Sequence, residues 1–136
     1  MKKYLVIVSF ALTAVGLHAQ NIASTTLTWK VDACLNVNTG VSTEATDQIL
    51  SYGNERIEWR DETGNVKATF EIIEVNGQWT NVTDNGIMLY EVLSEGRQGT
   101  VQFSRADGKY SIRIILLKPS ENPDVHRLSV STVTAS

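Results

Sequence analysis

The sequence predicts an all-β protein, an antiparallel meander of eight or nine strands that closes into a small barrel, with a β-sandwich as the alternative. Apolar and polar residues alternate along most of the chain, which is typical of half-buried strands. Turns rich in Gly, Asn and Asp separate the alternating segments. No segment between them is long enough for the crossover that a parallel sheet requires. The length of 136 residues fits one domain.

The first twenty residues have the pattern of a bacterial secretory signal peptide. Lys2 and Lys3 give a positive start, an apolar run covers residues 4–17, and Ala19 supplies a small residue at the expected cut. A transmembrane anchor is the alternative, but the run is shorter than the roughly 20 residues that span a bilayer. We expect export to remove residues 1–19. Residues 20–136 then form a single secreted or periplasmic domain with no integral membrane segment.

The charge balance argues against two classes of partner. The whole chain has 12 basic and 15 acidic residues, and processing removes Lys2 and Lys3, which makes the mature domain more acidic. A negative surface repels nucleic-acid phosphates and anionic lipids. We therefore expect no nucleic-acid partner. An integral outer-membrane barrel is also disfavoured, because charged residues lie opposite the apolar rows, where a lipid-facing belt would be: Arg56, Glu58, Arg60, Lys67 and Glu71.

The first strand of the mature chain is expected from about residue 26 to 37. Its apolar residues occupy every second position and share one face: Leu27, Trp29, Val31, Ala33, Leu35 and Val37. Trp29 is expected to anchor this strand in the core. Cys34 is the only cysteine, so it cannot form a disulfide within the chain, and we expect it to be a small buried apolar residue.

A β-hairpin is predicted over residues 48–61. A two-residue Gly53-Asn54 loop places Tyr52 opposite Glu55 and Leu50 opposite Ile57. Leu50, Tyr52, Ile57 and Trp59 then share one face. A short helix over residues 44–52, with Gly53 beyond its end, is the alternative. The hairpin is favoured because its pairing aligns the apolar residues.

The next two strands are expected on either side of residues 76–77. Ala68, Phe70 and Ile72 alternate along residues 66–75, and the adjacent Ile72-Ile73 pair suggests a bulge or a strand covered on both faces. Asn76-Gly77 is a strong hairpin signal. The return strand is expected to open with Trp79 and Val82.

The rest of the chain continues the meander. After a turn at residues 84–86, a strand is expected over residues 87–93. A loop at 95–99 leads to a strand that contains Val101 and Phe103, and Asp107-Gly108 turns the chain into a strand over residues 110–117. A proline-containing loop precedes the last strand, which is expected over residues 125–134.

In the order and size of its strands, the chain resembles the lipocalin-like (calycin) small barrels over nearly its whole mature length. Those proteins carry a Gly-x-Trp motif on the first strand, and Leu27-Thr28-Trp29 keeps the Trp without the Gly. They also pack a basic side chain from near the end of the last strand against that Trp, whereas Arg127 lies at the start of the last strand. The resemblance implies a small apolar ligand inside the barrel and, for most members, no enzymatic activity.

Few residues in the chain could carry catalysis or hold a cofactor. His126 is the only His beyond the signal peptide, and it is expected to be an exposed residue where the last strand begins. The chain has no G-x-S-x-G elbow, no His/Cys cluster for zinc and no glycine-rich phosphate loop. We therefore expect a protein that is not an enzyme and has no cofactor, catalytic residue or metal site.

The candidate ligand-binding residues are Trp59, Tyr90 and Arg113. Two aromatic side chains from different strands would form an apolar wall, and Arg113 is the one charged residue in an otherwise apolar run. If Arg113 points inward, it could bind the carboxylate of an amphipathic acid; if it points outward, it belongs to a solvated face. The expected function is binding of a small apolar or amphipathic molecule. The alternative is an envelope interaction module with a filled core.

Overall fold

The computed structural model describes residues 22–119 and 121–135, so the predicted signal peptide, residues 1–19, lies outside the described residues. A short 3-10 turn opens this part of the chain, and nine strands follow. The elements are η1 (Ile22–Ser24), β1 (Thr26–Asn36), β2 (Val41–Glu44), β3 (Gln48–Tyr52), β4 (Arg56–Arg60), β5 (Val66–Asn76), β6 (Gly86–Ser94), β7 (Arg97–Ala106), β8 (Lys109–Lys118) and β9 (Glu121–Ala135).

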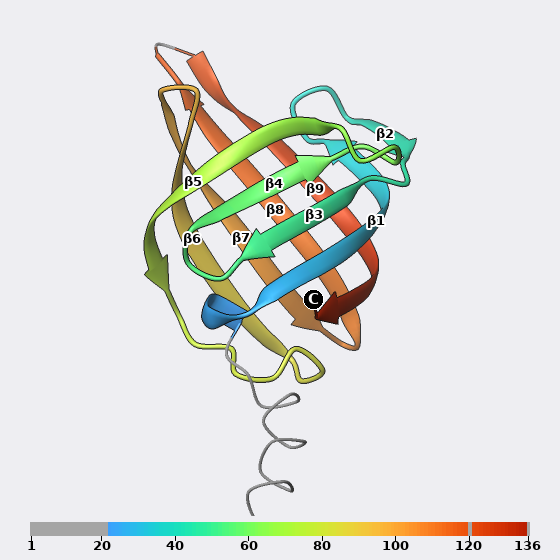
Figure 1. Ribbon diagram of the computed structural model, residues 1–136. Coiled ribbons are helices and arrows are strands. Elements are labelled where there is room, and N and C mark those ends of the chain that lie inside the picture. The colour runs from blue at the N-terminus through green and yellow to red at the C-terminus, as the bar shows by residue number, and fades with distance from the viewer. Residues whose placement is uncertain (1–21, 120, 136) are drawn as a thin grey trace, which may run out of the picture.

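The strands form a closed antiparallel barrel (Figure 1). From β3 onward each strand pairs with the next, β1 pairs with β3, and β9 pairs back with β1. The short strand β2 pairs only with the second half of β1, beside the half that pairs with β3. Eight strands therefore close the barrel, and β2 is an addition to it. The predicted all-β meander and its closure are confirmed, and the β-sandwich is not the fold.

The two ends of the barrel differ. The lower end in Figure 1 carries η1 and the loop between β5 and β6. Ile22 and Trp79 are almost fully buried there, and the Ile22 amide donates a hydrogen bond to the Trp79 carbonyl at 3.0 Å. The Trp79 indole also donates to the Asp84 carbonyl at 3.0 Å. We call this the closed end, and the opposite end, where β2 lies, the open end.

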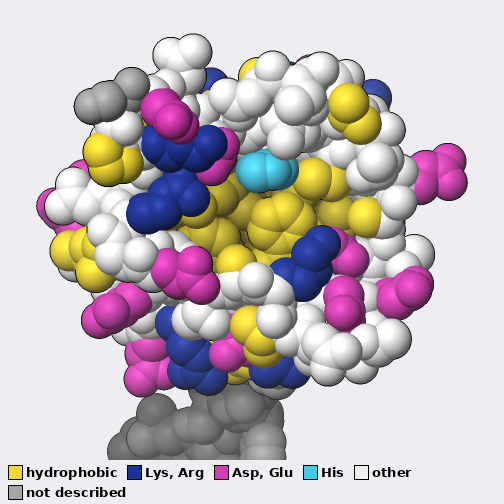
Figure 2. Space-filling model, turned by 90° about the horizontal axis from the view of Figure 1, so that it is seen from above, with side chains coloured by type: hydrophobic (Ala, Val, Ile, Leu, Met, Phe, Trp, Pro, Cys, Tyr) yellow, Lys and Arg dark blue, Asp and Glu magenta, His cyan; other side chains and the backbone are white. Residues whose placement is uncertain are grey.

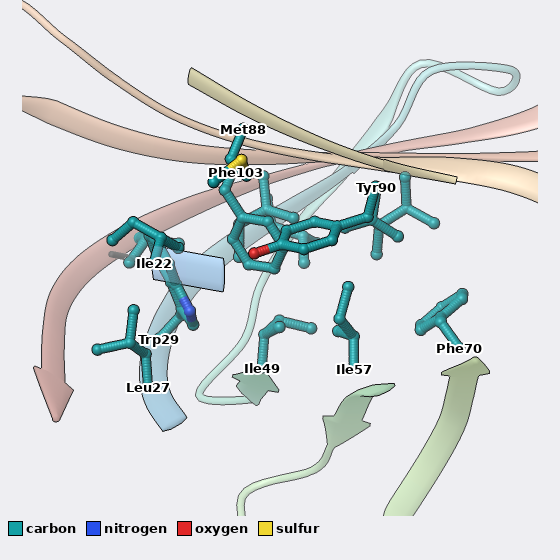
Figure 3. Packing of buried hydrophobic residues seen from close by; sticks show 14 of the residues in the cluster. Ile22, Leu27, Trp29, Ile49, Ile57, Phe70, Met88, Tyr90 and Phe103 are labelled. Carbon is teal, nitrogen blue, oxygen red and sulfur yellow. The ribbon is translucent and has the colours of Figure 1, made fainter. Parts of the chain in front are cut away.

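An aromatic cluster fills the part of the interior next to the closed end. The Trp29 ring lies 4.6 Å from Phe103 and 5.9 Å from Trp79, centroid to centroid. Tyr90 packs edge-on against Phe103 at 5.5 Å (Figure 3). Large buried side chains of this kind each contribute about 1.5–3 kcal/mol through removal of apolar surface from water. Trp29 is fully buried, so its predicted place in the core is confirmed.

The hairpin of β3 and β4 is present, but its predicted register is wrong by one residue. Tyr52 pairs with Arg56 and Ser51 pairs with Ile57, so three residues rather than two form the loop. A shift of one residue exchanges the two faces of a strand. Consequently Ile49 and Ser51 are buried, and the outward face carries Leu50 and Tyr52, which were expected inside.

The predicted alternation along β1 is correct only as far as Val31. Two register shifts between Lys30 and Ala33 interrupt the pairing with β9. Beyond them Cys34 lies opposite the fully buried Leu128, and Cys34 packs against the core. The expectation that Ala33, Leu35 and Val37 continue the face of Trp29 is therefore wrong, because the bulge changes the phase of the strand.

The predicted bulge in β5 is confirmed, but the hairpin after it is wrong. The register to β6 shifts between Ile72 and Glu74, and Ile73 is left 60% exposed. Residues 77–85 form a loop rather than a tight turn and a strand, because burial of Trp79 in the closed end outweighs the local hairpin signal. Gly86 permits this packing, since a Cβ there would lie 2.3 Å from Trp79 Cδ1.

Candidate ligand-binding site at the open end

A pocket of about 450 Å³ lies at the open end of the barrel. Figure 2 looks onto this end and shows an apolar hollow bordered by basic, acidic and His side chains. The lining comes from β1, β2 and their connections together with one residue each from β4, β5 and β9. These residues are Cys34, Asn36, Thr39, Val41, Thr43, Ala45, Asp47, Trp59, Lys67 and His126.

Asp47, Trp59 and Lys67 form a connected group in the wall of this pocket. The Trp59 indole Nε1–H donates a hydrogen bond to Asp47 Oδ2 at 2.8 Å. The Lys67 ammonium donates to the same oxygen at 2.9 Å, and its Nζ lies 4.8 Å from the centre of the Trp59 ring. Asp47 is only 7% exposed. A buried carboxylate is thus compensated by a cation and an N–H group, as buried charge requires.

A bulge brings Lys67 to this position. Trp59 pairs with Ala68, and Arg60 pairs with Val66. Lys67 is therefore the extra residue between two paired ones. Bulges of this kind redirect a side chain. Here the redirected side chain contacts Asp47 on the connection between β2 and β3.

His126 and Cys34 line the same pocket without adding charge at neutral pH. The His126 ring lies 5.7 Å from Trp59 in an edge-on arrangement. Burial lowers the pKa of His126, as does Lys67, while Asp124 acts in the opposite direction. Burial is also the main cause that raises the pKa of the Cys34 thiol. A neutral imidazole and a protonated thiol therefore extend the uncharged wall of the pocket.

A second, larger hollow of about 700 Å³ adjoins the pocket and shares Ala45, Asp47 and Lys67 with it. Its lining contains carboxylates from four further residues and the additional cation Lys30. The four acidic residues are Asp32, Glu44, Asp61 and Glu62. This side of the open end is therefore rich in negative charge.

The basic residues Arg97 and Lys118 at the open end are held by one acidic residue. Arg97 Nη2 lies 2.9 Å from Asp124 Oδ2, and Lys118 Nζ lies 2.8 Å from Asp124 Oδ1. The hydrogen bonds from Lys118 and Arg97 lower the pKa of Asp124. This ion-pair group ties β7, β8 and β9 together next to the pocket.

The three predicted site residues do not converge. Trp59 lines the pocket, whereas Tyr90 is fully buried among the core side chains. Arg113 is exposed between the buried Ile112 and Ile114. Of the two orientations considered for Arg113, the structure has the outward one, because strand alternation places its two apolar neighbours inside and the guanidinium outside.

Arg127, the basic residue of the last strand that was considered in the resemblance to lipocalin-like barrels, also lies on the outer face. Arg127 is exposed and pairs with Leu35 and Arg113. Trp29 pairs instead with Val133 of β9 and Ile49 of β3. Arg127 therefore makes no packing contact with the Trp of the first strand.

Of the ten residues that line the pocket, the sequence predicted only Trp59 as a site residue, and the missed residues include His126, Asp47 and Lys67. His126 was expected to be exposed, but β9 begins at Glu121, so His126 lies inside a strand opposite Asn36 and Ile114. Asp47 lies in a connection and Lys67 in a bulge, where simple alternation does not apply. An acidic residue preceding the apolar β3 was the one available signal for Asp47.

Within the described residues, no helix is both long and apolar enough to cross a membrane. Comparison with models of protein families, with curated proteins and with solved structures finds no match. The geometry of the open end is therefore the observation from which a function is inferred.

Proposed function

We propose that this protein is an exported, non-enzymatic binding protein that holds a small apolar or amphipathic molecule in the open end of a lipocalin-like barrel. The observation that carries this proposal is the pocket of about 450 Å³ with Trp59 and His126 in its wall. Small-molecule sites are typically concave and mostly apolar, with a few placed polar groups. The Asp47–Lys67 pair supplies such groups.

The filled closed end limits the size of the proposed ligand. Phe103 and Trp79 both pack against Trp29 below the pocket, and Ile22 covers that end. The ligand would therefore occupy the upper part of the barrel and enter from the open end. A compact molecule or the end of a longer chain fits this space better than a ligand that runs through the barrel.

The chemistry of the pocket wall supports binding rather than catalysis. The raised pKa of Cys34 keeps it in the thiol form, which is a weak nucleophile. Asp47 already accepts hydrogen bonds from Trp59 and Lys67, so it is not a free general base. Without an activated nucleophile in the described pocket wall, a binding role is the better assignment.

Intrinsic fluorescence tests the proposal. Purified mature protein would be titrated with octan-1-ol while tryptophan emission is followed. A saturable change is expected in the wild type and in Trp79→Phe, whose indole lies in the closed end. The change should be lost or strongly reduced in Trp59→Phe. Absence of saturable binding of octan-1-ol and of charged probes with the same chain would overturn the proposal.

An interaction module remains the second candidate because the outer wall carries an apolar patch. Ile73 and Leu117 are 60% and 51% exposed, and they border a hollow of about 230 Å³ with Ile115. Exposed apolar patches often mark protein contacts. A photo-crosslinker at position 115 should join this face to one defined envelope protein if this function holds. Loss of that product in Leu117→Glu, with octan-1-ol binding unchanged, would separate the two functions.

A further inference from the structure

We propose that the polar end of the ligand is an organic ammonium ion. This ammonium replaces the Lys67 ammonium beside Asp47, and Asp47 becomes its counter-ion. This inference rests on the proposed binding function and adds the chemical class of the ligand. It replaces the carboxylate expected from an inward Arg113, since that guanidinium lies on the outer face.

The first step is that the pocket wall already holds an ammonium group. Lys67 Nζ lies 2.9 Å from Asp47 Oδ2 and 4.8 Å from the centre of the Trp59 ring. A carboxylate beside an indole face is a favourable environment for ammonium ions, because ion pairing and cation–π attraction act together. Lys67 thus occupies the position that a ligand amine would take.

The second step is that Asp47 is fixed in position and would repel an anion. Asp47 as a whole is 7% exposed, and the Trp59 Nε1–H donates a hydrogen bond to Asp47 Oδ2 at 2.8 Å. A ligand carboxylate at this point would meet a buried like charge, which is costly. A ligand ammonium would instead meet a carboxylate whose position is already set.

The third step is that Lys67 can leave at small cost. Its side chain is 47% exposed, whereas that of Asp47 is 10% exposed. Because about half of the Lys67 side chain is already exposed, its departure regains rotamer entropy and hydration, which offset part of the lost ion pair. Asp47 cannot remain buried without a cation, so departure of Lys67 requires that the incoming amine replace it.

The fourth step is the charge of the surroundings. The adjoining hollow is lined by four acidic residues besides Asp47 and by only two basic residues. The acidic residues are Asp32, Glu44, Asp61 and Glu62, and the basic residues are Lys30 and Lys67. The basic groups Arg97 and Lys118 are paired with Asp124. The resulting negative potential on this side concentrates cations and disfavours anions.

Calorimetric titration with three probes of equal chain length tests the inference. Octylammonium, octan-1-ol and octanoate would be titrated into the mature protein at low salt and below their micelle concentrations. Octylammonium is expected to bind about tenfold more tightly than octan-1-ol, in line with an ion pair and a cation–π contact in a partly desolvated site. Octanoate is expected to bind most weakly.

Variants with matched controls distinguish direct contact from general charge. Lys67→Met should increase the affinity for octylammonium several-fold, because the competing ammonium is gone. Lys118→Met, which removes the same charge elsewhere at the open end, should not. Asp47→Asn should abolish the preference for octylammonium over octan-1-ol. Glu62→Gln, which removes one acidic charge from the adjoining hollow and keeps an acceptor for the Thr46 hydroxyl, should weaken that preference far less than Asp47→Asn does.

The outcomes separate this inference from the function on which it rests. If none of the three probes binds, the proposed binding function fails. If octan-1-ol binds as well as octylammonium, or octanoate binds best, the ammonium inference fails and the binding function stands. Lys67→Met provides a second readout if Asp47→Asn does not fold. Octylammonium should raise the melting temperature of Lys67→Met more than that of the wild type, and an equal or smaller rise would overturn the inference.

Discussion

The indole Nε1–H of Trp29 donates a hydrogen bond to the hydroxyl of Ser51 at 3.0 Å inside the barrel. Both residues are fully buried, and they belong to the paired strands β1 and β3. Ser51 is thus the acceptor that allows an indole N–H to be buried away from water. The bond also depends on the register of the β3–β4 hairpin, because a shift of one residue would turn Ser51 outward.

Substitution of either partner should destabilise the protein, with different magnitudes. Ser51→Ala leaves the Trp29 N–H without an acceptor and should cost about 1–3 kcal/mol. Trp29→Ala removes a large core side chain and should cost about 3–5 kcal/mol. Urea denaturation measures both, with the exposed Ser129→Ala as the control. A loss below about 1 kcal/mol for Trp29→Ala would contradict its assignment to the core.

A buried tyrosine, Tyr90, and a partly buried one, Tyr110, should respond differently to loss of their hydroxyls. The Tyr90 hydroxyl has no hydrogen-bond partner among the described residues, and burial raises the pKa of Tyr90 to about 12. The Tyr110 hydroxyl donates to the Val82 carbonyl at 2.8 Å. Tyr90→Phe should therefore be neutral or stabilising, while Tyr110→Phe should cost about 1 kcal/mol. Denaturation midpoints that fall equally in the two variants would show that the Tyr90 hydroxyl is satisfied.

The stability of the protein should depend on pH through His126. Burial lowers the pKa of its imidazole below the ordinary value of 6.5. As the pH falls below 6.5, the unfolded chain takes up a proton that the folded chain does not, so stability decreases until the folded pKa is passed. Urea midpoints at pH 8 and pH 5 should differ less in His126→Gln than in the wild type. An identical pH dependence in the two proteins would contradict this role of His126.

Export should be visible in the mass of the mature protein. Removal of residues 1–19 leaves Gln20 as the first residue, which can cyclise. Intact-mass analysis of protein recovered from the host envelope or medium tests this. Retention of the apolar run over residues 4–17 would contradict the prediction of a secreted or periplasmic protein.

Alternation of residue types was sufficient to predict the fold, because it reports which face of each strand is buried. The prediction held for Leu27, Trp29 and Val31 in β1 and for Ala68 and Phe70 in β5. It also gave the closed meander, since consecutive short turns leave little choice of strand order. These features depend on local patterns that most of the strands display; β2, which is exposed at every position, shows no such pattern and was not predicted.

The errors in the predicted fold arise where one additional residue in a loop or a bulge changes which side chains of a strand face the core. The loop after Tyr52 has three residues instead of two, and a bulge near Asp32 reverses the later part of β1. Neither leaves a local signature strong enough to outweigh a regular alternation. The hairpin predicted from Asn76-Gly77 is also absent, because Trp79 is buried in the closed end instead of continuing into a return strand.

The candidate site could be predicted only in part for the same reason. Trp59 was identified from its aromatic side chain and lines the pocket. Arg113 was selected as an unusual charge in an apolar run, but its neighbours alternate regularly and place it outside. Asp47 and Lys67 come from a connection and a bulge. The contact between Asp47 and Lys67 depends on how the strands pair in the closed barrel, and alternation along the sequence does not specify that pairing.

The pairing of β1 with β9 also determines how the protein can be attached to something else. Leu27 lies opposite Ala135, so both ends of the described chain emerge side by side at the closed end (Figure 1). A fusion partner, an affinity tag or a surface linkage at either end would therefore leave the opposite entrance uncovered. Immobilised through such a linkage, the barrel would present that entrance to solution, and a single flexible linker could join the two ends without crossing it.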